Sequence, residues 1–284
     1  MTAPAEPTHR EPLSVGVLGA MGVAAVAYFV ATFVVLHFVQ PELDPVEHFV
    51  SRYAFGRFGW LVTLAFVVVG VGTLALALGL HRSLQPGFRV ATSVVLMSIA
   101  GVGFVGSGIF KTNPLSPSGI TAPTATGILH DLAGFVLFVA LLIGAFILRG
   151  VFARDARWHG LERSALRFAL GMLFAATVMF AVPRDVVGLV QRGLLAIMMT
   201  WLGVVGWWMS QLDPVDGAQY AATTSHVPAW SAVHDASSTR PFPRIARGDP
   251  WSGDRADTGA GERPWAFIGQ RFVEGIPGLR ISPP

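Results

Sequence analysis

Long apolar stretches, separated by short polar segments, dominate the chain. Each reaches or approaches the ~20 residues that a helix needs to cross about 30 Å of hydrocarbon. A surface helix of a soluble domain would carry a polar stripe at a spacing of about 3.6 residues, and these stretches carry none. The pattern therefore predicts an all-α, polytopic membrane protein with a six-helix transmembrane bundle. The expected spans are residues 13–39, 58–80, 89–110, 127–149, 164–182 and 188–209.

Composition supports a membrane protein. Hydrophobic residues make up 52% of the chain and charged residues 13%, against about 25% charged residues in soluble domains. No basic stripe with interleaved aromatic residues is present, so we expect membrane lipids, and no nucleic acid, as partners. The chain has no cysteine, which excludes disulfides, thiolate catalysis and cysteine-ligated metals.

The chain divides into three regions by composition. A short N-terminal segment, residues 1–12, precedes the transmembrane domain, residues 13–209. The tail, residues 210–284, is rich in Pro, Ser, Gly, Asp and Arg, so we expect it to be largely disordered. Apolar residues between Trp265 and Ile281 leave open a second interpretation, in which this part of the tail docks on the inner membrane surface or on a partner.

The basic residues predict an orientation in the membrane. Six spans place both termini on one side, and basic residues near the span ends favour the cytoplasm for that side. The side with the termini carries Arg10, Arg82, Arg89, Arg149, Arg154, Arg157, Arg163 and Arg167, and the opposite side carries Arg52, Arg57, Lys111, Arg184 and Arg192. We therefore expect a multi-pass protein of the cell (plasma) membrane with both termini in the cytoplasm.

The segment after the first span, residues 40–57, predicts a short amphipathic helix on the outer membrane surface. Asp44 can cap the helix, Pro45 suits the first helical position, and Glu47 can complete a capping box. From Pro45 to about Phe55, apolar and polar residues separate onto two faces.

Polar residues on three outer segments predict an extracytoplasmic pocket. Asp44, His48 and Ser51 have the spacing of one helix face. Ionisable groups at membrane depth are costly and normally face a bundle interior or a water-filled cavity. The candidate catalytic residues are His48, Ser51, His130 and Asp131, and the candidate substrate-binding residues are Asp44, Gln191 and Arg192.

These same residues carry a resemblance to a known family. The run from Asp44 to Gly56 resembles the first signature of a bacterial six-span family, catalogued as domain of unknown function nine-nine-eight, with its His-x-x-Ser pattern. Gly108-Ile109-Phe110 followed by His130, and the Gln191-Arg192 pair, also fit that family. The similarity covers residues 13–209. It implies the six-span fold and membrane residence, and it implies no particular reaction.

Several functions remain open at this stage. In an enzyme that hydrolyses or transfers a lipid headgroup, Ser51 would be the nucleophile, the Asp and His residues would activate water or bind a divalent metal, and Arg192 would hold a phosphate or carboxylate. In a carrier or sensor, His130 and Asp131 would relay protons. His37 and His130 are a candidate pair of haem ligands. A non-catalytic scaffold is the fourth possibility, and the sequence decides neither catalysis nor the identity of a metal or cofactor.

Each candidate residue also has a structural interpretation. Asp44 and Glu47 have the spacing of a helix cap. Arg192 can form an ion pair with Asp185 or Asp131. The glycines between Gly101 and Gly108 indicate close packing of helices.

Overall fold

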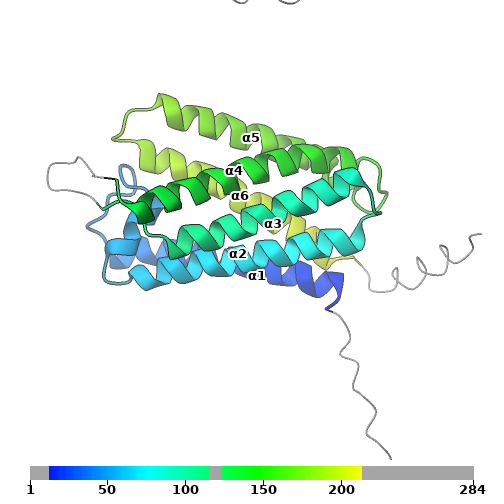
Figure 1. Ribbon diagram of the computed structural model, residues 1–284, viewed down its shortest axis with the longest axis horizontal. Helices are drawn as coiled ribbons and strands as arrows, with labels where there is room; N and C mark the ends of the chain where they lie inside the picture. The colour runs from blue at the N-terminus through cyan, green and yellow to red at the C-terminus, as the bar shows by residue number, and fades with distance from the viewer. Residues whose placement is uncertain (1–12, 115–122, 213–284) are drawn as a thin grey trace, which may run out of the picture. The chain divides into compact units, whose positions relative to one another are not determined.

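The computed structural model describes residues 13–114 and 123–212, a region built from helices without any β-strand. Six long helices lie side by side in the described part of the chain (Figure 1). They are α1 (Val15–Val39), α2 (Gly59–Ser83), α3 (Phe88–Ile109), α4 (Ala125–Phe152), α5 (Glu162–Ala181) and α6 (Val187–Ser210). Two short 3-10 helices, η1 (Val50–Phe55) and η2 (His159–Leu161), lie in the connections.

The predicted spans agree with these helices. All six are long and apolar enough to cross a membrane, so the chain is an all-α, multi-pass membrane protein. Helices satisfy their own backbone hydrogen bonds, which is why the apolar stretches adopt this structure in hydrocarbon. The expectations for residues 1–12 and for most of the tail fall outside the described residues.

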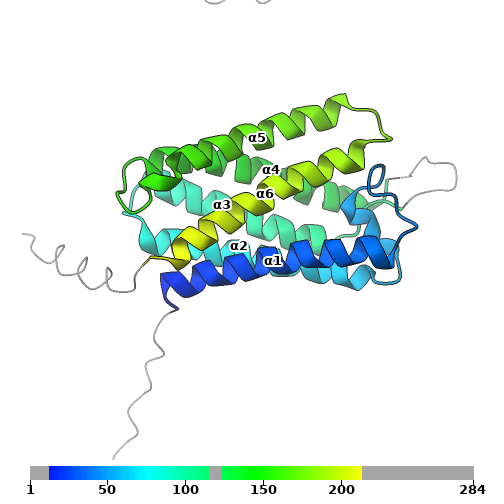
Figure 2. The ribbon, with the colours of Figure 1, turned by 180° about the vertical axis from the view of Figure 1, so that it is seen from behind.

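The six helices form a ring of neighbours. Each packs against the helix that follows it in sequence, and α6 closes the ring against α1. Helix α5, which packs against α4 and α6, makes the least extensive helix–helix contacts in the ring. The α1–α2 connection, which contains η1, lies at the same end of the bundle as the α5–α6 loop (Figures 1 and 2). This end is here called the η1 end. The start of α1 and the end of α6 lie at the other end, here called the terminal end.

Glycines bring neighbouring helices into close contact. A Cβ added at Gly19 of α1 would lie 2.6 Å from the carbonyl oxygen of Gly206 in α6. A Cβ at Gly70 of α2 would lie 2.7 Å from the carbonyl oxygen of Gly101 in α3. Within membranes, such small residues let backbones approach and gain van der Waals contact. The packing interpretation of the glycines in α3 is therefore confirmed.

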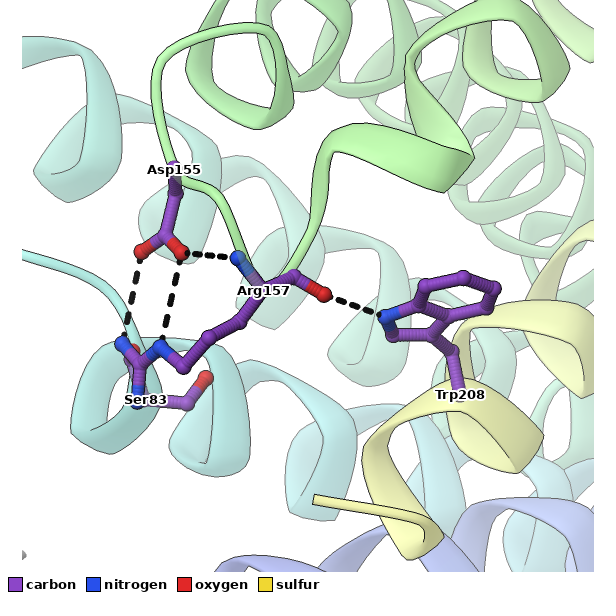
Figure 3. Close-up of polar contacts among 4 residues, drawn as sticks. All are labelled: Ser83, Asp155, Arg157 and Trp208. Carbon is purple, nitrogen blue, oxygen red and sulfur yellow. Dashed lines mark hydrogen bonds and ion pairs between the residues drawn. The ribbon is translucent and has the colours of Figure 1, made fainter. Parts of the chain in front are cut away.

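Arg157 links three elements at the terminal end. Its side chain forms an ion pair with Asp155, at 3.3 Å, and also donates a hydrogen bond to the carbonyl of Ser83, the last residue of α2 (Figure 3). Its backbone carbonyl accepts a hydrogen bond of 2.9 Å from the indole of Trp208 in α6. The loop between α4 and α5 is therefore fixed to α2 through the Arg157 side chain and to α6 through the Trp208 indole.

The predicted helix over residues 45–55 is shorter than expected. The 3-10 helix η1 begins at Val50, and residues 45–47 form a turn. Asp44 does cap this turn, since its carboxylate accepts the backbone N–H of Val46 at 2.7 Å. The carbonyl of Val46, however, accepts the N–H of Leu189 in α6 at 2.9 Å, so it is used in a contact with another helix. The first turn of the predicted helix forms, because the N–H of His48 bonds to the carbonyl of Asp44 at 2.9 Å. Contacts with α6 replace the continuation of the helix, since Val46 and Val50 bond to Leu189 and Gln191 and not to each other.

Candidate functional site

A cavity of about 580 Å³ lies at the η1 end, lined by residues of η1, of α2 to α6 and of the connection between α3 and α4. Its volume falls within the ~300–1,000 Å³ of typical ligand sites. Polar or charged residues that line it are Ser51, Arg52, Ser107, Thr112, Asn113, His130, Asp131 and Gln191. Its apolar wall includes Phe66, Phe104, Leu137, Phe138, Ala176, Met179, Phe180, Leu194, Leu195 and Met198.

Helix geometry separates the polar part of the cavity from its apolar part. On α4, Asp131, Phe135 and Phe138 follow one another at helical spacing along one face, and all three line the cavity. From Asp131 to Phe138 this wall extends about 10 Å along the helix axis. On α6, Gln191 lies at the polar level, and Leu194 and Met198 continue the wall in the apolar direction. The cavity is therefore amphipathic along its length.

His130 is anchored to the end of α3. Its Nδ1 lies 2.9 Å from the carbonyl oxygen of Ser107 and 2.9 Å from that of Phe110. Two carbonyl acceptors require a proton on Nδ1, so Nε2 is the ring nitrogen that can accept a proton or a hydrogen bond. The predicted position of His130 and Asp131 near the start of the fourth span is confirmed.

Arg52 and Asp131 bring opposite charges to the cavity. Arg52 donates a hydrogen bond of 2.9 Å from a terminal guanidinium nitrogen to the carbonyl of Asn113, in the connection between α3 and α4. Burial lowers the pKa of the Arg52 guanidinium, and the charge of Asp131 acts in the opposite direction. An arginine whose ordinary pKa exceeds about 12 remains charged at neutral pH. Arg52 is among the basic residues that predict the orientation, and it was not among the candidate site residues predicted from the sequence.

Ser51 and Ser107 place hydroxyl groups at the cavity. Ser51, the second residue of η1, is 5% exposed and lines the cavity together with His130. Within the described residues, Ser51 and His130 are not hydrogen bonded to each other. The hydroxyl of Ser107 is buried and has no hydrogen-bond partner among the described residues. The sequence singled out Ser51 but gave no signal for Ser107 within an apolar span.

Arg192 contacts neutral acceptors. Its Nε donates to Nε2 of His37 in α1 at 3.0 Å, and one terminal nitrogen donates to the carbonyls of His48, at 2.6 Å, and Gly188, at 3.0 Å. The described ion pairs within 4.0 Å join Arg157 to Asp155 and His159 to Glu162, and neither involves Arg192. The expected pairing of Arg192 with Asp131 or Asp185 is therefore wrong.

His37 uses both ring nitrogens within the protein. Its Nδ1 is hydrogen bonded to the carbonyl of Phe33, one turn earlier in α1, and its Nε2 accepts the hydrogen bond from Arg192. A haem ligand needs a free ring nitrogen. The pairing of His37 with His130 as axial ligands is not supported by this arrangement.

Gln191 binds the start of η1. Its side-chain oxygen accepts the backbone N–H of Val50 at 2.9 Å, and so supplies the cap for η1 from α6. Gly188, one turn earlier, lies so close to the loop that an added Cβ would be 2.5 Å from the carbonyl oxygen of His48. The Gln191-Arg192 pair therefore attaches the loop before η1 to α6, and Gln191 also lines the cavity.

Asp44 and His48 lie outside the cavity lining. Asp44 is exposed, and its backbone carbonyl lies 3.2 Å from Nδ1 of His48. The expected shared face of Asp44, His48 and Ser51 does not form, because the first two residues precede η1. Within residues 13–114 and 123–212, no three His, Asp or Glu side chains gather in an arrangement that could hold a metal ion. The structure thus brings Ser51, His130, Asp131 and Gln191 together at one cavity, and Arg192 is not among the residues that line it.

Comparisons with known proteins give one match. Residues 23–208 match the model of the family described as Protein of unknown function (DUF998). No curated protein matches the chain. No solved structure matches it either.

Proposed function

This chain belongs to the family described as Protein of unknown function (DUF998), and from its cavity we propose that it binds an amphipathic molecule of the lipid class. The observation that carries the proposal is the division of the cavity into a polar end and an apolar wall. Arg52, His130 and Asp131 offer charge and hydrogen bonds at one level, and phenylalanine, leucine and methionine side chains follow below it. A headgroup and a hydrocarbon chain match these two parts.

The position of the polar end suits a headgroup. Helix α4 has 28 residues and is therefore about 42 Å long, which exceeds the ~30 Å hydrocarbon core. Asp131 lies near its first turns, close to the membrane interface. The positive-inside bias favours the extracytoplasmic interface of the cell membrane for this end.

Two cavity residues also reach the outer surface of the bundle. Phe135 of α4 is 62% exposed and Phe180 of α5 is 83% exposed, and both line the cavity. The outer surface of a membrane bundle faces hydrocarbon. The gap between α4 and α5 is therefore the proposed route by which a ligand enters from the bilayer, and α5 is the least tightly packed helix of the ring.

Photo-crosslinking tests the proposal. The full-length protein in nanodiscs would be irradiated with a lysophospholipid that carries a diazirine in its acyl chain. Crosslinks are expected on the apolar wall, at Leu137, Phe138, Met179 and Leu194. Gly134→Leu should reduce these crosslinks severalfold, because Gly134 lines the cavity and its added Cβ would meet one atom only, the Ser107 hydroxyl at 3.9 Å.

Gly193→Leu is the matched control. Gly193 lies on α6 next to the cavity residues, yet it is exposed and an added Cβ would meet nothing within 4 Å. This variant should keep the crosslinks of the original protein. Equal labelling of the cavity wall and of exposed span residues such as Val71 of α2, unaffected by Gly134→Leu, would overturn the proposal.

A reaction on the bound headgroup is the second candidate, and the tautomer of His130 favours it. The carbonyls of Ser107 and Phe110 hold Nδ1 as a donor, which leaves Nε2 as a general base. Release of labelled headgroups from phospholipid vesicles would measure the reaction. His130→Asn should abolish it, because asparagine can retain a donor near the position of Nδ1 but lacks Nε2. Absence of any release by the original protein would reject this candidate and leave binding untouched.

A further inference from the structure

Two opposite charges at the polar end of the cavity lie near each other without forming an ion pair. Arg52 of η1 and Asp131 of α4 both line the cavity. The ion pairs within 4.0 Å in the described residues are formed by other side chains, near the terminal end. Asp131 is nevertheless close enough to influence the pKa of Arg52. Arg52 and Asp131 can therefore each bind a further group of opposite charge.

Arg52 has donors to spare. A guanidinium carries five N–H donors, and within the described residues Arg52 uses one terminal nitrogen, on the carbonyl of Asn113. The fork-shaped group matches a phosphate or a carboxylate, whose two oxygens can accept two parallel hydrogen bonds. Arg52 is half-buried, which strengthens such a contact relative to open water.

Asp131 is exposed at the polar end of the cavity, and it has no hydrogen-bond donor among the described side chains and backbone groups, although it belongs to a transmembrane helix. A carboxylate at membrane depth is stable when a cation, a donor or water accompanies it. Within the cavity, a ligand ammonium group would supply both the charge and the donors. Arg192 of α6 binds His37 and backbone carbonyls through Nε and one terminal nitrogen, and it is not among the residues that line the cavity.

We propose that the cavity selects a zwitterionic headgroup, with its phosphate or carboxylate on Arg52 and its ammonium group on Asp131. This inference rests on the proposed binding of an amphipathic molecule and specifies its chemistry. A purely anionic headgroup would leave Asp131 unpaired and close to a second negative charge. A purely cationic headgroup would leave Arg52 unpaired and close to a second positive charge. A zwitterion satisfies both residues, and the two charges on the protein set its orientation.

Native mass spectrometry of the full-length protein in a neutral glycoside detergent tests the selection. The probes are lysophosphatidylethanolamine, lysophosphatidylglycerol and a long-chain alkylammonium, all with the same chain length. The zwitterionic probe should bind about tenfold more tightly than either singly charged probe, the effect expected for one charged hydrogen bond. Asp131→Asn should raise the Kd of the zwitterionic probe until it equals that of the anionic probe. Arg52→Gln should weaken both phosphate-containing probes and spare the alkylammonium.

Arg184→Gln and Asp185→Asn provide matched controls. Both residues are exposed at the η1 end and lie outside the cavity lining, so these variants should leave all three Kd values unchanged. Equal binding of the three probes, sensitive to Gly134→Leu but insensitive to Asp131→Asn and Arg52→Gln, would overturn the zwitterion inference and retain the proposed function. If none of the three probes binds the original protein saturably, both the zwitterion inference and the proposed function are rejected.

Discussion

Arg192 is held at the η1 end by three neutral acceptors, the imidazole of His37 and the carbonyls of His48 and Gly188. Its guanidinium also lies over the ring of Tyr53, with its carbon 5.9 Å from the ring centroid. These contacts connect α1, the loop before η1, and α6. The residue therefore joins three parts of the chain, and its planar fork is what allows several acceptors to be reached at once.

We predict that Arg192→Lys destabilises the protein by about 2 kcal/mol, because hydrogen bonds from a charged group contribute roughly 1.5–3 kcal/mol each and one ammonium nitrogen cannot replace all three contacts. Thermal unfolding in detergent would measure the change. Arg184→Lys, at an exposed site in the α5–α6 loop, is the control and should unfold at the original temperature. Equal unfolding temperatures for the two variants would contradict the role assigned to Arg192.

His130 has a structural contact and a free nitrogen on the same ring. We predict that His130→Asn keeps most of the stability, since its amide nitrogen can replace Nδ1 as a donor to the carbonyls of Ser107 and Phe110. His130→Gln, whose amide lies farther from the backbone, should lose about 1 kcal/mol or more, the contribution of a hydrogen bond. Unfolding midpoints of the two variants measure the difference, and the reverse ranking would show that Nδ1 is not the anchoring atom.

At the scale of elements, the 3-10 helix η1 depends on α6 for its start. The backbone N–H of Val50 is capped by Gln191, and the loop before it is bound through the Leu189 to Val46 hydrogen bond. The close approach requires glycine at position 188. Since Ser51 and Arg52 belong to η1, the same contacts determine where these two residues lie in the cavity.

Gly188→Ala should therefore displace the loop. Its Cβ would lie 2.5 Å from the carbonyl oxygen of His48, an overlap that costs about 1–3 kcal/mol. Gly193→Ala, on the same helix with nothing within 4 Å, should instead stabilise the protein by about 0.5–1 kcal/mol through helix propensity. Unfolding midpoints measure both changes, and hydrogen exchange at Val50 reports on the cap. A Gly188→Ala variant with an unchanged unfolding midpoint and unchanged hydrogen exchange at Val50 would show that the loop is not held against α6.

At the scale of the whole described part, six helices in a ring leave a cavity where packing is weakest. Contacts of α5 with α4 and α6 are the least extensive, and all three helices contribute residues to the cavity at the η1 end, together with η1, α2 and α3. The opposite end is closed by the loop that Arg157 ties to α2 and α6 (Figure 3). The terminal end of the bundle is thus closed by a hydrogen-bonded loop, and the η1 end contains the cavity.

The orientation of this bundle is open to a direct test. We predict that a reporter fused to the C-terminus is active only in the cytoplasm, and that one inserted near Ser118 is active only outside. The physical reason is the excess of arginine near the span ends on the side of the termini. A pair of reporters, one active in each compartment, would make the measurement at both positions. The reversed pattern would show that the charge bias is too small to set the topology.

The candidate site was predicted in part. The sequence placed His130 and Asp131 near the start of a span and put Ser51 in the polar group, because polar residues beside apolar stretches stand out in sequence. It also placed Asp44 and His48 on a helix face, and here local spacing was misleading. Asp44 instead bonds locally to Val46 and His48, and the carbonyl of His48 accepts a hydrogen bond from Arg192 of α6. Hydrogen bonds to residues far along the chain leave no trace in local periodicity.

The number and length of the spans followed from the sequence by itself. Crossing hydrocarbon depends on local length and composition, because a helix satisfies its backbone hydrogen bonds internally. The partners of polar groups were decided only by tertiary structure. Arg192 finds His37 at a separation of 155 residues, and Val50 finds Gln191 at 141. Such pairs form because the ring brings α6 beside α1 and η1, and no local pattern distinguishes these acceptors from the carboxylates that Arg192 was expected to find.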